Sequence, residues 1–200
     1  MADLETSSVM PRVITFLSSL LQRVADSNDF SSQFIPHKVS VFHGLARPSI
    51  SIQDYLERIY QYANCSPSCY VVAYVYLDRF VQKQPSLLVN SLNVHRLIIT
   101  SVLISAKFMD DISYNNAYYA KIGGISTAEM NVLEVDFLFG LGFQLNVTPT
   151  TFHTYNFYLH KEMMMQTTPL SEPSMHMARS PKFHYYLNED ESTHQKQLTV

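Results

Sequence analysis

The chain has 200 residues, which suits one domain with flanking segments, and 46% of them are hydrophobic, which is enough for a real core. The formal net charge of -3 argues against nucleic acid as the main partner, because phosphate binding depends on clustered lysines and arginines. Cys65 and Cys69 form no disulfide framework, so we expect an intracellular protein of the nucleus, the cytoplasm or both. No apolar run approaches the ~18 residues of a membrane span, so we expect no membrane contact.

The first predicted helix begins at Pro11, after a loose start over residues 1–8, because proline suits a first helical position. Apolar residues then recur at three- and four-residue steps up to Val24, which predicts one buried helix face. The mixed segment over residues 26–50 reads as a connection. We therefore assign residues 1–49 to an N-terminal helix and a linker.

Five further helices are expected over residues 50–148, and cap signals mark their starts. The signals are Ser51 with Asp54, Ser66 before Pro67, the segment 90–93, and Ser126 with Glu129; the remaining helix is expected over about Asn115 to Lys121. The pair Gly123-Gly124 predicts the end of the fourth of these five helices. Residues 97–108 are apolar nearly all round, so we place the third of these five helices at the centre of the bundle. The fold class is therefore all-α.

A seventh helix is plausible over residues 149–166, after Pro149. Beyond it the helical periodicity ends, and prolines stand among serine, histidine and glutamine. We expect residues 167–200 to be a disordered tail. The tail holds Ser180 before Pro181, a candidate for phosphorylation by a proline-directed kinase.

The sequence offers no machinery for catalysis, so we expect a protein that is not an enzyme and holds no cofactor. Gly123-Gly124 lacks the spacing of a phosphate-binding loop, and no nucleophile elbow is present. His37 and His43 have no cysteines in the register of a zinc site, so we predict no metal centre. A helical interaction module is what remains.

Charged residues inside apolar helices are the candidates for such an interaction, since a charge there is costly unless it is paired or lies at an interface. They are Asp78, Lys107 and Glu134. Two plain alternatives stay open. Lys107 has Asp110 and Asp111 three and four residues on, within reach of a helical pair, and Glu134 fits a solvated stripe with Asp136.

Three short segments resemble the cyclin family. Residues 76–80 read Tyr-Leu-Asp-Arg-Phe, residues 103–108 read Leu-Ile-Ser-Ala-Lys-Phe, and the pair Leu133-Glu134 precedes a series of leucines and Phe143. The segments 90–96 and 116–124 resemble the phosphate-regulatory cyclin of yeast. Over residues 1–165 the chain resembles the plant P-type cyclins, also called U-type, most closely the U4 group.

This resemblance implies a single five-helix cyclin box over residues 50–148 that binds and activates a cyclin-dependent kinase, of the A-type-like kind. The setting would be cell division or phosphate-linked signalling. Lys107 and Glu134 would bond the main chain around the regulatory C helix of the kinase. The apolar part of the contact would come from Ile104, Phe108, Leu138, Phe143 and Leu145. A cyclin-fold scaffold that recruits partners without activating a kinase is the alternative.

The chain departs from the family at the start of the first helix of the box. The arginine that normally meets the position of Asp78 is absent, and the region reads Pro-Ser-Ile-Ser over residues 48–51. We expect Asp78, as a structural residue, to pair with Arg58 or Lys107 instead. The substrate-docking sequence of cell-cycle cyclins is also absent. Asp111, just past Lys107, is a candidate for meeting the arginines that hold the phosphate of the kinase activation loop.

Overall fold

The computed structural model describes residues 3–31 and 39–167. Within these two ranges it holds seven helices and no strand, which confirms the all-α class. Their bounds are α1 (Asp3–Ser31), α2 (Ile52–Tyr62), α3 (Pro67–Lys83), α4 (Val94–Met109), α5 (Asn116–Gly123), α6 (Thr127–Leu141) and α7 (Pro149–Thr167). Of the predicted tail over residues 167–200, Thr167 is the last residue of α7, and the rest, with Ser180, lies outside the described residues, as does His37. The division at residues 49, 148 and 166 stays a prediction.

Side-chain caps begin three of the helices, and two of these caps, Ser51 and Ser126, are predicted from the sequence. The side-chain oxygen of Ser51 accepts from the backbone N–H of Asp54, and that of Ser126 from Glu129, at 3.0 and 3.1 Å. Asn115 caps α5 in the same way. Gly124 ends α5 in the left-handed conformation, with φ of 70°, which glycine adopts without strain. The predicted signals therefore mark the starts of α2 and α6 and the C-terminal end of α5.

Three helix starts differ from the expectation. One is α4, where the Asn93 side chain makes no cap hydrogen bond. α1 begins at Asp3, eight residues before Pro11, so the loose start expected over residues 1–8 is wrong for residues 3–8. A proline removes one backbone hydrogen bond of a helix, and the turns on both sides of it can still form. At the start of α3, the Ser66 side chain caps no N–H group; the backbone N–H of Ser66 instead donates to Asp110 Oδ2 at 3.0 Å.

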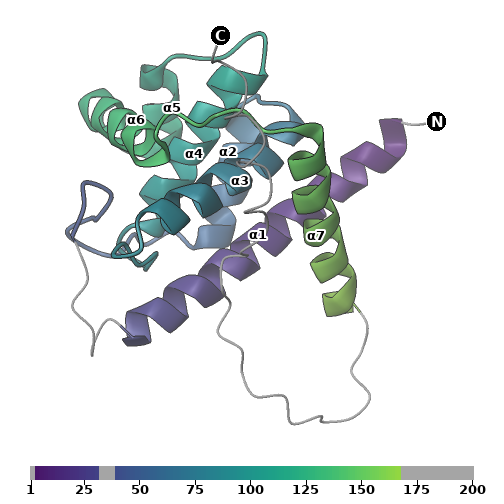
Figure 1. Ribbon diagram of the computed structural model, residues 1–200, viewed down its shortest axis with the longest axis horizontal. Coiled ribbons are helices and arrows are strands. Elements are labelled where there is room, and N and C mark those ends of the chain that lie inside the picture. Colours follow the sequence, from purple (N-terminus) through teal and green to yellow (C-terminus); the bar gives the residue numbers. More distant parts are fainter. Residues whose placement is uncertain (1–2, 32–38, 168–200) are drawn as a thin grey trace, which may run out of the picture.

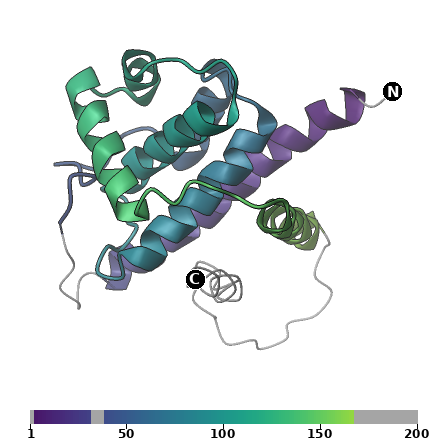
Figure 2. The same ribbon diagram turned by 45° about the horizontal axis from the view of Figure 1, so that its top comes forward.

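α4 lies at the centre of the bundle, as its apolar sequence predicts. Leu97, Ile99 and Leu103 are fully buried, and α2, α3, α5 and α6 all contact this helix. Figures 1 and 2 show α4 enclosed by these neighbours. Because its sides are covered, α4 presents only its two ends to solvent.

α1 crosses the outside of the bundle as the longest helix, and α7 packs against it (Figures 1 and 2). α1 contributes Ile14, Leu17 and Leu21 to the core, and α7 contributes Tyr155 and Leu159. Both helices lie outside the predicted five-helix box. They extend its core, because they share buried side chains with α2 and α3.

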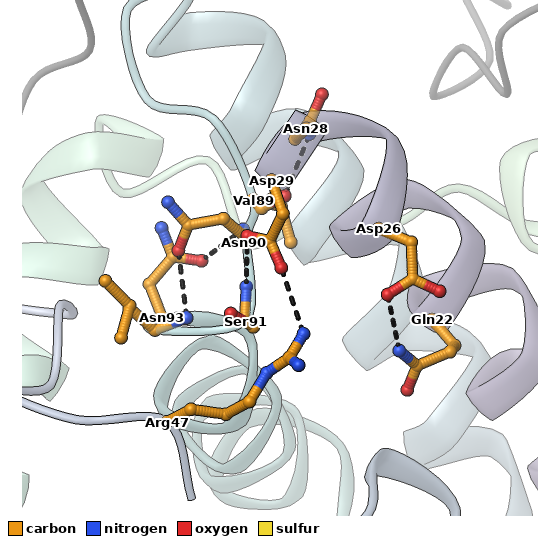
Figure 3. A network of polar contacts seen from close by, with 10 residues as sticks. Gln22, Asp26, Asn28, Asp29, Arg47, Val89, Asn90, Ser91 and Asn93 are labelled. Carbon is orange, nitrogen blue, oxygen red and sulfur yellow. Dashed lines mark hydrogen bonds and ion pairs between the residues drawn. The ribbon is translucent and has the colours of Figure 1, made fainter. Parts of the chain in front are cut away.

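A polar network fixes the end of α1 to two distant segments (Figure 3). Asp29 accepts from Arg47 Nη2 at 3.0 Å through one carboxylate oxygen, and from the backbone N–H of Ser91 at 3.1 Å through the other. Asn28 Nδ2 donates to the Val89 carbonyl at 2.8 Å. The linker before α2 and the connection between α3 and α4 are thereby held together.

Gly140 is the position at which we expect the packing to be least tolerant. It lies in α6 against Phe80, whose ring stacks on Phe137 with centroids 4.4 Å apart. In the Gly140→Ala variant the added methyl group would overlap the Phe80 ring. Alanine gains ~1 kcal/mol over glycine in an open helix, but overpacking costs about 1–3 kcal/mol.

We therefore expect Gly140→Ala to lower the free energy of unfolding in urea titrations. The control is Val132→Ala, in the same helix but 54% exposed, which should change stability by less than ~0.5 kcal/mol. A Gly140→Ala variant more stable than the wild type would contradict the packing of Phe80.

Candidate functional site

A charged pair joins the end of α4 to the middle of α6. Lys107 lies in the last turn of α4, and its Nζ is 2.6 Å from Glu134 Oε1. The two side chains are 33% and 17% exposed, so the pair sits at the surface without being fully solvated. The predicted pairing of Lys107 within its own helix is not what forms; Asp110 turns away and accepts from Ser66 and Cys69.

Two asparagines complete this charged pair. Asn116, the first residue of α5, accepts from Lys107 Nζ at 2.6 Å and donates to Glu134 Oε2 at 2.7 Å. The same amide donates to Asn131 Oδ1 at 2.7 Å. We call Lys107, Asn116, Asn131 and Glu134 the Lys107 cluster. The sequence analysis missed both asparagines, because nothing in their spacing shows that α5 and α6 bring them to Lys107.

The Lys107 cluster keeps bonding capacity for a further group. An ammonium has three donors and the cluster uses two of those of Lys107. The Glu134 carboxylate has about four lone-pair positions, and the cluster occupies two. A partly exposed ion pair adds only about 0–1 kcal/mol to stability. Stability alone therefore gives a weak reason for placing these charges here, and binding gives a stronger one.

Exposed apolar side chains stand on the elements that carry the cluster. Phe108 follows Lys107 directly and is 50% exposed, and Phe143, just past α6, is 57% exposed. Phe139 and Val135 on the outer side of α6 are also exposed, and the rings of Phe139 and Phe143 meet edge to face, 5.2 Å apart. The sequence signal for this outer side is that apolar residues of α6 also occupy positions outside its buried face, at Val132, Val135 and Phe139.

The remaining predicted contact residues differ in exposure. Ile104 is only 2% exposed, so its side chain supports α4 from inside. Leu138 and Leu145 are half-buried and pack against the core. Asp111 is exposed, beyond the end of α4. The structure thus brings Lys107, Glu134, Phe108 and Phe143 to the surface and leaves the three aliphatic side chains largely beneath it.

Backbone contacts fix the segment that carries Phe143. The Tyr76 hydroxyl donates to the Leu145 carbonyl at 2.6 Å, and Arg79 Nη1 donates to the Gln144 and Asn146 carbonyls at 3.1 and 2.9 Å. Tyr76 and Arg79 belong to the segment 76–80 that resembles cyclins. Its role here is therefore to hold the chain after α6 against α3.

Asp78, the third charge of interest, is buried in α3 and binds neither Arg58 nor Lys107. Its Oδ2 accepts from Gln82 Nε2 at 2.8 Å and from the Tyr155 hydroxyl of α7, while Oδ1 has no partner. The expected partners were wrong because Tyr155 reaches it from α7, outside the predicted box. Burial raises the pKa of Asp78 to about 6, although the hydrogen bonds from Tyr155 and Gln82 favour its charged form.

The described ranges hold no metal-binding cluster and no membrane-spanning helix. Over residues 3–31 and 39–167, no three histidine, cysteine or acidic side chains gather where they could hold a metal ion. No helix in the same ranges is long and apolar enough to cross a membrane. His43 is engaged within the fold, accepting from the backbone N–H of Ser40 at 3.0 Å.

An all-helical bundle with a polar cluster among exposed apolar side chains is the architecture of a protein-binding module. Comparison with known proteins makes this specific. The family model described as Cyclin matches residues 5–145. The chain is 63% identical to Cyclin-U4-1 of Arabidopsis thaliana, over 98% of this chain and 96% of that protein. It is 55% identical to Cyclin-P4-1 of Oryza sativa subsp. japonica, over 88% and 86% respectively.

The chain therefore belongs to the cyclin family, and its relatives are plant U- and P-type cyclins. This confirms the resemblance drawn from the three short segments. Members of the family are regulatory subunits of kinases, with a role in the cell cycle, so a regulatory role and a kinase partner follow at the level of the family. The match begins inside α1, well before residue 50.

The raised pKa of Asp78 makes a prediction about stability and pH. Its folded-state pKa, about 6, lies above the unfolded value of about 3.9. Protonation of Asp78 therefore stabilises the fold fully below pH ~4, and this stabilisation is lost as the pH rises through about 6. The contribution amounts to about 3 kcal/mol, from ~1.4 kcal/mol per pKa unit.

In Asp78→Asn, the amide oxygen can replace Oδ2 and the NH2 group can occupy the unpaired position of Oδ1. We expect urea titrations to show the wild type losing stability relative to this variant between pH ~4 and ~7. Asp136→Asn, which changes an exposed carboxylate, serves as the control and should follow the wild type. Parallel pH profiles for the wild type and Asp78→Asn would refute the assignment.

Proposed function

We propose that the chain binds a cyclin-dependent kinase through the Lys107 cluster and the exposed aromatic side chains beside it, and that binding activates the kinase. The observation that carries the proposal is the pair Lys107–Glu134, which is 2.6 Å apart, partly exposed and only partly used by its own neighbours. Phe108 and Phe143 supply the apolar surface that a stable contact needs.

The chemistry of the pair suits the main chain of a partner helix. Lys107 offers a charged donor and Glu134 charged acceptors, so backbone carbonyl and N–H groups at a helix end can meet both. Such bonds require no particular side chain on the partner. Asn116 and Asn131 hold the two charges in place before binding, which reduces the entropy lost on association.

Activation would follow from the placement of the regulatory C helix of the kinase. A kinase is active when a lysine of its third strand pairs with a glutamate of this helix. A partner that presses the helix inward completes that pair and contributes no catalytic atom. We propose an A-type-like cyclin-dependent kinase as the partner, acting in cell division or in phosphate-linked signalling.

The alternative is a cyclin-fold scaffold that recruits partners without activating a kinase. The two proposals share the binding surface and differ in output. A kinase assay with a purified cyclin-dependent kinase, with and without the chain, separates them: a rise in phosphorylation supports activation, and stable binding without a rise supports the scaffold.

We expect Lys107→Ala combined with Glu134→Ala to weaken kinase binding by about 30-fold or more, since truncating a buried charge contact costs about 2–5 kcal/mol. The measurement is calorimetry or surface plasmon resonance with the purified kinase. A matched control is Arg96→Ala with Glu129→Ala, which removes the other ion pair between α4 and α6, also at 2.6 Å. Equal kinase binding by the two double variants would contradict the assignment of the Lys107 cluster as the kinase-binding surface.

Asp111 is proposed to meet the arginines that normally hold the activation-loop phosphate of the kinase. It is exposed beyond α4, four residues past Lys107, so a kinase bound at the cluster would lie within its reach. We expect Asp111→Asn to lower activity toward an unphosphorylated kinase by about 3- to 10-fold, while the phosphorylated kinase is little affected. Equal activity of variant and wild type on both forms would rule out this role.

Ser180 remains a proposed phosphorylation site of the tail. Its support is the Ser-Pro dipeptide with Arg179 before it and Lys182 after it.

A further inference from the structure

A second surface feature, at the other end of α4, is a cleft of about 440 Å³. Residues 44–46 and 48–50 of the linker form one wall, and Tyr55 and Arg58 come from α2. His95 and Arg96 come from α4, and residues 123–125 complete the lining. Pockets of about 300–1,000 Å³ hold drug-sized ligands. The cleft therefore has room for more than a single ion.

The charge of the cleft is positive although the whole chain carries -3. Its charged lining residues are Arg58 and Arg96, and none of its described lining residues is acidic. Arg96 Nε is already paired with Glu129 Oε1 at 2.6 Å. Arg58, in contrast, has no ion pair with any described residue, and its buried Nε has no hydrogen-bond partner. A buried donor without a partner is costly, and an acceptor in the cleft would remove that cost.

The Arg58 side chain is positioned by its surroundings. Its guanidinium lies over the Tyr55 ring, 5.2 Å from the centroid, and the Tyr55 hydroxyl donates to the Gly123 carbonyl at 3.2 Å. Gly124 adjoins the guanidinium, since a Cβ at this position would lie 3.5 Å from Arg58 Nη2. The aromatic ring and the glycine turn therefore leave the charged group facing the cleft in a fixed place.

His95 adds a hydrogen-bond acceptor to the same cleft. Its Nε2 donates to the Ile50 carbonyl at 3.1 Å, so in the neutral ring Nδ1 is the acceptor. Nδ1 is buried and has no partner. The cleft is thus lined by an arginine without an ion pair to a described residue and by a histidine whose buried Nδ1 has no partner. A peptide with an anionic side chain matches both, because its backbone N–H groups are donors.

The linker wall is already ordered. Gly44 donates its N–H to the Leu92 carbonyl at 2.7 Å, His43 Nε2 lies 3.2 Å from Asn93 Nδ2, and Arg47 is paired with Asp29 in the network of Figure 3. A ligand that enters does not have to order this wall, which favours binding.

We propose that this cleft is a docking site for a phosphorylated peptide segment of a partner protein, with the phosphoryl group on Arg58. Guanidinium groups bind phosphate through two parallel hydrogen bonds, and a backbone N–H of the peptide would meet His95 Nδ1. His95 and Lys107 are twelve residues apart on α4, or about 18 Å along its axis. The cleft and the Lys107 cluster therefore lie at opposite ends of α4.

The test is fluorescence anisotropy with the full chain and a labelled peptide library that has one fixed phosphoserine, with the matched serine library as reference. We expect binding of the phosphorylated library alone, and a loss of about tenfold or more in Arg58→Gln, the range of a charge-assisted bond. Arg12→Gln, an exposed arginine of α1, is the matched control and should bind normally. Equal binding by Arg58→Gln and Arg12→Gln, or no binding by the wild type, would overturn the proposal.

A second variant keeps the test valid if Arg58→Gln fails to fold. Leu45 lines the cleft and is fully exposed, so Leu45→Glu adds a negative charge without disturbing the core. It should weaken binding of the phosphorylated library, whereas Val39→Glu, exposed and outside the cleft, should not. Identical binding by the two variants would contradict the site.

Two further arms separate the sources of phosphate and the two surfaces. Inorganic phosphate should compete only weakly, since it lacks a peptide backbone; competition as strong as that of unlabelled phosphopeptide would show a site for the ion and overturn docking. The variant with Lys107→Ala and Glu134→Ala should still bind the phosphorylated library. Loss of kinase binding and loss of peptide binding in the cleft are therefore distinguishable.

Discussion

The burial of α4 is the constraint on which the rest of the structure depends. Four helices contact it, and its side chains from Val94 to Ala106 are buried apart from Arg96. A helix enclosed in this way meets solvent only at its ends. The first turn brings His95 and Arg96 to the cleft, and the last turn brings Lys107 to α6. Both surfaces for which we propose partners are therefore ends of the same rigid helix.

The flanking helices α1 and α7 hold parts of the predicted box in place. α7 donates to the buried carboxylate of Asp78 through Tyr155, and α1 is tied through Asp29 to the linker before α2. The first contact replaces the missing arginine as a partner for Asp78. The second orders the wall of the cleft. Tyr155 and Asp29, which lie outside the predicted box, thus fix the partner of Asp78 and the wall of the cleft.

Local signals in the sequence predict much of the fold. The caps at Ser51, Asn115 and Ser126 are interactions between residues three apart, so they are visible in the sequence. The central place of α4 followed from its composition. The contacts of Asn116 with Lys107 and Glu134, and of Tyr155 with Asp78, join segments 9, 18 and 77 residues apart, and only the packing of helices brings them together. Lys107 and Glu134 themselves are candidates because they are charges within apolar helices, and the resemblance to cyclins implies their role.

Hydrogen–deuterium exchange of the chain, alone and with a purified A-type cyclin-dependent kinase, tests the central claim most directly. The account predicts that the kinase protects the end of α4 and the outer side of α6, around Lys107, Glu134 and Phe143. It predicts no protection at Arg58 and the linker wall of the cleft. Protection confined to the cleft, with α6 unchanged, would contradict the account.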